Sequence, residues 1–112
     1  MSVEGTGMIA FVLALALAAP NPSSIDAPRR AFASCLKTFE SNQLQGKVDA
    51  AAYGTAVKSA CPAEAQALED ALVKYDVAMG TKRASAQANA DRDVEDYRLT
   101  SEERYRDLSA PQ

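Results

Sequence analysis

Cys35 and Cys61 are the two cysteines of this sequence, and they constrain its fold more than any other feature. Two cysteines allow one intramolecular pairing, so we expect a single Cys35–Cys61 disulfide in a chain that folds in an oxidising compartment. Closing a loop of about 26 residues would stabilise the folded state by roughly 3–4 kcal/mol, because the crosslink restricts the unfolded chain. The close CxxC spacing of thiol oxidoreductases is missing, which favours a structural crosslink over a redox-active pair.

The segment from Met8 to Ala19 is apolar and uncharged. It is shorter than the about 20 residues of a membrane-spanning helix and has the length of a signal-peptide core. Ala16-Leu17-Ala18 places small residues where a signal peptidase reads them, so residues 1–18 are predicted to be a signal peptide and 19–25 a flexible mature N-terminus. We therefore expect a periplasmic or secreted bacterial protein with no stable membrane span after cleavage. Since no basic residue precedes Met8, retention as an inner-membrane anchor is the alternative.

The composition argues against several classes of function. The 112 residues contain no histidine, which removes the commonest general base and the commonest zinc ligand. The net charge is −3 without a basic patch, so a nucleic-acid partner is not expected. Serines are present, but without histidine they cannot form an ordinary Ser-His pair. We expect no catalytic residues, no cofactor and no metal.

Helical spacing of apolar residues predicts an all-α fold with a single domain over residues 26–108 and a disordered tail at 109–112. Asp26 is predicted to cap the first helix, which should end near Gln45 before Gly46. Asp49 is the expected N-cap of a second, shorter helix.

Pro62 marks the start of a third helix, because the residue before a proline is driven out of helical conformation. No proline follows between Ala63 and Ala110, which favours one long C-terminal helix, bent at Gly80. Breaks at Gly80 or at Thr100 are the alternatives. The result is a helical hairpin or three-helix arrangement, with the disulfide joining the first helix to the start of the third.

A long third helix would project beyond the two shorter ones from Lys82 onward. Its exposed stripe would offer a possible interaction face of small and aromatic residues: Ala86, Ala90, Val94, Tyr97 and Tyr105. Such a seam suits pairing with another helix, either of a protein partner or of a second copy of the chain. The alternative is that this part folds back as a fourth helix or frays.

These features favour an exported helical protein that acts through protein–protein contacts and is not an enzyme. A small carboxylate-dependent enzyme is the alternative, with Asp91, Asp93 and Glu95 as its candidate residues. Asp91 and Glu95 share a helix face and would suit an acid–base pair. Arg92 lies among these carboxylates, so a solvated, ion-paired helix face is the simpler interpretation.

Overall fold

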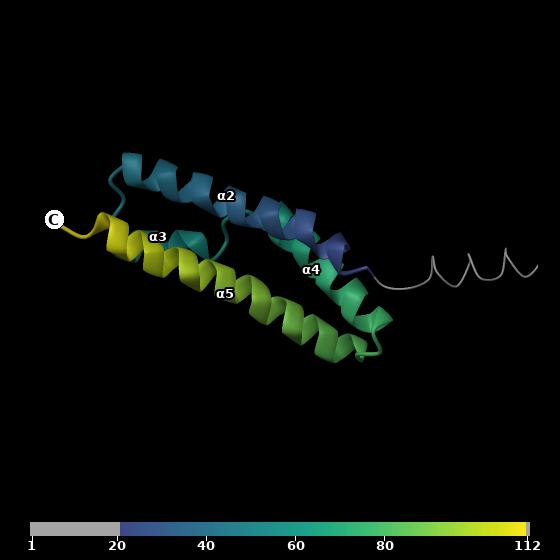
Figure 1. The fold of residues 1–112 in the computed structure, drawn as a ribbon. Helices are drawn as coiled ribbons and strands as arrows, with labels where there is room; N and C mark the ends of the chain where they lie inside the picture. The colour runs from purple at the N-terminus through teal and green to yellow at the C-terminus, as the bar shows by residue number, and fades with distance from the viewer. Residues whose placement is uncertain (1–20, 112) are drawn as a thin grey trace, which may run out of the picture.

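The computed structural model describes residues 21–111 and contains four α-helices preceded by one short 3-10 helix (Figure 1). The elements are η1 (Pro22–Ile25), α2 (Asp26–Gln45), α3 (Ala50–Val57), α4 (Pro62–Ala78) and α5 (Arg83–Ser109). No strand occurs within 21–111, so the predicted all-α class is confirmed. The predicted signal peptide, residues 1–18, lies outside the described residues.

The helices form three legs laid side by side (Figure 1). α2 is the first leg. α3 and α4 follow one another as a broken second leg that returns alongside it, and α5 is the third leg. α5 contacts α2, α3 and α4, so it packs on both other legs and completes the core.

The break in the middle leg lies where the sequence predicts it. Cys61 has a left-handed backbone, with φ of 55°, and Pro62 is the first residue of α4. Proline fits the first turn of a helix because its missing N–H would have no partner there. Cys61 is thus the N-cap residue of α4, and the chain turns sharply at that point.

The predicted end of α2 and the predicted N-cap of α3 are confirmed, and the start of α2 is shifted by one residue. α2 ends at Gln45 with Gly46 as its C-cap, and the Asp49 side chain accepts a hydrogen bond from the Ala52 amide at 2.8 Å. At the other end of α2, Ile25 occupies the N-cap position and Asp26 is the first helical residue. The predicted cap, Asp26, therefore lies one residue after the observed N-cap, Ile25.

Residues 22–25, which belong to the predicted flexible N-terminus, form η1. The Asn21 side chain accepts a hydrogen bond from the Ser23 amide at 3.0 Å, which begins the turn. Ile25 is buried in the core, and this burial fixes η1 against α2 and α4. At the C-terminus, α5 includes Ser109, the first residue of the predicted tail.

The prediction of one continuous C-terminal helix is wrong, because the chain reverses at Gly80. The amide of Gly80 donates to Val77 O at 3.0 Å and that of Thr81 donates to Asp76 O at 2.9 Å, the paired bonds of a Schellman motif. Gly80 has φ of 101°, a conformation that residues with a Cβ rarely adopt. The chain thus breaks at the first of the two sites considered, and α5 runs without interruption through Thr100.

The predicted projection of the C-terminal helix is likewise wrong: α5 folds back along α4, as the alternative had it. Ala86 and Ala90 are buried against Val73 of α4, with Leu72 and Val77 alongside. Alanines allow two helices to approach closely, and a projecting α5 would leave this stripe in water.

Large buried side chains fill the space between the legs. The main core cluster includes Phe32, Leu36, Tyr53, Val57, Leu68 and Tyr105. The rings of Tyr53 and Tyr105 stack with centroids 3.8 Å apart, which locks α3 against α5. Gly54 leaves room for the Glu102 side chain of α5, since a Cβ there would lie 2.9 Å from Glu102 Oε1. Within the described part of the chain, no helix combines the length and apolar character needed to cross a bilayer.

Candidate functional site

The predicted interaction face on α5 points into the molecule. Ala86, Ala90, Val94 and Tyr105 are buried, and Tyr97 is half-buried. The Tyr97 ring lies 5.6 Å from that of Phe32, and its hydroxyl accepts a hydrogen bond from Arg29 at 3.2 Å. In this fold these five residues hold α5 to the other legs and do not form an open surface.

A buried polar network joins the three legs. Ser101 of α5 donates a hydrogen bond to Glu40 Oε2 of α2 at 2.6 Å, and the Tyr53 hydroxyl of α3 lies 2.7 Å from Ser101 Oγ. Arg104 forms an ion pair with Glu40, donating from Nε to Oε1 at 2.8 Å and from its Nη2 to Oε2. Each member therefore has a partner, as a buried polar group requires.

Protonation in this network follows from its contacts. Burial opposes the charge on Glu40, but the hydrogen bonds from Arg104 and Ser101 outweigh it and hold the Glu40 pKa below its ordinary value. Burial raises the pKa of Tyr53, which therefore stays a neutral donor. Since Ser101 is fully buried and Glu40 is 4 % exposed, the network serves the fold and is closed to a substrate.

The sequence held one signal for this network that our interpretation missed. Glu40 follows Phe32 and Leu36 at successive intervals of four, which places a carboxylate on the buried face of α2. A buried carboxylate requires a cation or several donors. The identity of that cation, Arg104, depended on how α5 packs, which no local pattern gives.

A groove lined by four carboxylate side chains lies where the middle leg breaks. α3 ends at Val57, so part of α5 is left uncovered beside the start of α4. The hollow there measures about 320 Å³. We call it the acidic groove; it is lined by Val57, Lys58, Glu69, Asp91, Val94, Glu95, Arg98, Leu99 and Glu102.

The acidic groove combines an apolar floor with a negative rim. Val57 and Val94 are buried beneath it, while Leu99 is 47 % exposed at its edge. Four carboxylates and two cations line it; Arg98 donates to Ala60 O at 2.7 Å, and Glu102 pairs with Arg106 of the same helix at 3.5 Å.

Glu69 carries the clearest electrostatic signature of the groove. Partial burial raises its pKa, and hydrogen bonding and repulsion from Asp91 raise it further. Within residues 21–111, neither Glu69 nor Glu95 lies within 4.0 Å of a basic side-chain nitrogen. The groove is therefore a place where a positive group from outside would be stabilised.

The three carboxylates of the enzyme alternative are not brought together. Asp91 and Glu95 line the acidic groove. Asp93 lies on the α2 side of α5, where it pairs with Arg29 at 3.5 Å.

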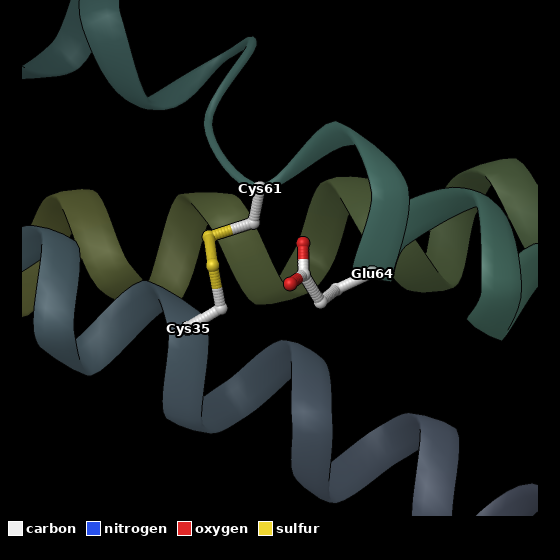
Figure 2. A group of neighbouring side chains, drawn as sticks. All are labelled: Cys35, Cys61 and Glu64. Atoms are coloured by element: carbon white, nitrogen blue, oxygen red, sulfur yellow. A yellow bond between two sulfur atoms is a disulfide. The ribbon is translucent and has the colours of Figure 1, made fainter.

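The predicted disulfide is confirmed, and a carboxylate lies beside it. Cys35 in α2 and Cys61 at the start of α4 are bonded, with their Cα atoms 6.1 Å apart. Glu64, on the first turn of α4, turns its carboxylate toward the two sulfur atoms (Figure 2). A ligand atom of each of the three residues lies within 4.8 Å of the others, and the group borders an open hollow of about 520 Å³.

Comparisons with known protein families, with curated proteins and with solved structures give no significant match to this chain.

Proposed function

We propose that this chain is an exported helical protein that acts by binding another protein, and that the acidic groove receives a basic segment of that partner. The observation that carries the proposal is the groove itself. It pairs an apolar floor with two carboxylates, Glu69 and Glu95, that have no ion-pair partner within the described part of the chain.

The chemistry of the groove selects the class of partner. A lysine or arginine has an apolar stem and a charged head, so its stem can lie along the apolar floor of the groove while the head meets Glu69 and Glu95. Leu99 at the rim adds a site for a neighbouring apolar side chain. A basic helix with leucine beside lysine supplies both kinds of contact.

Export is supported by the crosslink. A disulfide fits a periplasmic or extracellular protein, since the cytosol keeps most thiols reduced. The apolar segment from Met8 to Ala19 also supports export, because it has the length of a signal-peptide core. Retention of that segment as an anchor would place the same groove at a membrane surface and leave the binding proposal unchanged.

An enzyme is the second candidate, and the Glu69–Asp91 pair is the observation that favours it. A carboxyl whose pKa is raised by burial and by a neighbouring carboxylate is an arrangement that acid–base catalysts use. Binding is favoured because Asp93 is turned away from the groove and paired with Arg29, and because the polar network at Ser101 is closed to a substrate.

The test uses a synthetic amphipathic peptide of lysine and leucine, and a matched peptide in which glutamate replaces lysine. Two-dimensional NMR of the labelled chain locates the binding surface. We expect the lysine peptide to shift amide signals of Val57, Lys58, Glu69 and residues 91–102, and to bind more weakly as salt is added. The glutamate peptide should leave the spectrum unchanged.

Charge variants make the test specific. Glu69→Gln and Glu95→Gln should each weaken binding about two- to five-fold, the effect of losing one partly exposed ion pair. Glu103→Gln, on the exposed side of α5, is the matched control and should bind like the native chain. Equal weakening by the control, or shifts scattered over all acidic surfaces, would overturn the proposal.

A further inference from the structure

We propose that Cys35, Cys61 and Glu64 are a redox-gated site for a zinc-class divalent cation: reduction of the disulfide frees two thiolates that bind one Zn²⁺ together with the Glu64 carboxylate. This inference does not depend on the acidic groove, which lies at other residues. Figure 2 shows the three side chains converging from two helices.

The geometry is close to what zinc requires. With Zn–S bonds of about 2.3 Å and Zn–O bonds of about 2.1 Å, tetrahedral ligand atoms lie roughly 3.5–4 Å apart. The ligand atoms here already lie within 4.8 Å of one another. Once the bond is broken the two sulfur atoms separate to ordinary contact distance, so only small side-chain rotations are needed.

The ligands are held by well-fixed backbone. Cys35 lies in the middle of α2, while Cys61 is the N-cap and Glu64 the third residue of α4. Pro62 fixes the first turn, so the spacing of Cys61 and Glu64 is set before any metal arrives.

The charge of the donor set requires a cation. Two thiolates and one carboxylate carry three negative charges, and Glu64 is the one charged residue among the described residues that line the hollow. Thiolate ligands select zinc over magnesium or calcium, which prefer oxygen donors. The hollow gives an entry path and leaves the fourth coordination position to water.

The redox step balances with a dithiol as reductant. One thiolate of the dithiol attacks a sulfur of the Cys35–Cys61 bond and releases the other cysteine as a thiolate, giving a mixed disulfide. The second thiol of the reductant resolves it, so the dithiol becomes a disulfide and the two cysteines gain two electrons and two protons. Zn²⁺ then displaces those two protons from the thiols. In the oxidised chain neither sulfur is a thiolate, and the site is closed.

The experiment titrates the whole chain with Co²⁺, a spectroscopic substitute for Zn²⁺, without oxygen and after reduction by a phosphine. We expect one Co²⁺ per reduced chain with thiolate-to-cobalt charge-transfer absorption, which Zn²⁺ abolishes, and no such absorption for the oxidised chain. Glu64→Gln should weaken Co²⁺ binding by about 10-fold or more. Glu103→Gln is the matched control and should titrate like the native chain.

Circular dichroism of the same samples covers the case in which reduction unfolds the chain. If helix content falls on reduction, Co²⁺ must restore it as the absorption grows. The proposal is overturned by a reduced chain that shows no charge-transfer band, by a band in a chain that stays unfolded, or by a Glu64→Gln variant that binds as well as the control. One metal shared between two chains would overturn it equally.

Discussion

At the scale of single residues, the Glu40 carboxylate is a buried charge that the fold must stabilise with hydrogen-bond donors. Its side chain is 5 % exposed, and a carboxylate so placed costs several kcal/mol unless partners replace its water. Arg104 and Ser101 replace it: burial opposes the charge, but their hydrogen bonds hold the pKa of Glu40 below its ordinary value. Because the partners come from α5 and Glu40 from α2, this network permits one register between the two legs.

The first prediction concerns removal of one partner. Arg104→Met should lower the free energy of unfolding by about 2 kcal/mol, because it leaves a buried charge short of donors. Since Arg104 is 39 % exposed, water offsets part of the loss. Adding Glu40→Leu should restore more than half of it, as replacing a whole buried pair by apolar groups is far less costly than breaking it. Urea unfolding followed by circular dichroism measures the two single variants, Arg104→Met and Glu40→Leu, and the double variant.

Arg106→Met is the matched control for Arg104→Met. Arg106 is 62 % exposed and pairs with Glu102 within the same helix, so its loss should change stability by about 0.5 kcal/mol or less. If the double variant loses as much as Arg104→Met and Glu40→Leu together, the network is not a coupled unit and the explanation given for its register is incorrect.

At the scale of elements, the helix ends that the sequence predicted are those with local causes. Gly46 ends α2, Asp49 caps α3 and Pro62 begins α4, each through groups within a few residues of itself. The reversal after α4 has a distant cause. Gly80-Thr81 suits a bend as well as a stop, and the burial of Ala86 against Val73 decides between them. The spacing of apolar residues could not predict the Glu40–Arg104 pair either, because the pair forms only when α5 packs against α2.

The second prediction tests the reversal. Gly80→Ala should destabilise the chain by about 1–2 kcal/mol, because φ of 101° is unfavourable for any residue with a Cβ. Crowding plays no part, since no atom lies within 4 Å of where that Cβ would stand. Thermal unfolding followed by circular dichroism gives the measurement.

Gly46→Ala provides the comparison, because Gly46 also caps a helix but has φ of −77°, which alanine adopts without strain. It should be neutral or stabilising by up to about 1 kcal/mol, through the smaller entropy of its unfolded chain. Equal effects of the two substitutions would show that the backbone conformation at Gly80 is not what holds the α4–α5 turn.

At the scale of the whole molecule, the error in the predicted architecture came from taking residues 62–108 as one helix, longer than either helix before it. α4 is instead the second half of the middle leg, so α3 and α4 together lie along α5, which has 27 residues. Laid end to end they form one leg from Ala50 to Ala78 that matches α5, so no part of α5 needs to project. The crosslink was predictable because two cysteines leave one pairing. The acidic groove was not, since it exists through the break between α3 and α4.

The disulfide stabilises the chain at the break between α3 and α4, and the last prediction tests this role. Cys61 lies at the junction of the two halves of the middle leg, and its bond to Cys35 fixes the junction to α2. Replacing both cysteines by serine should lower the free energy of unfolding by roughly 3–4 kcal/mol under oxidising conditions. The native chain with reductant should match the serine variant, and the variant should not respond to reductant. Both are measured by urea unfolding with a chelator present, so that metal at the freed thiols does not restore stability. Equal midpoints for the native chain with and without reductant would mean that packing alone holds the broken leg in place.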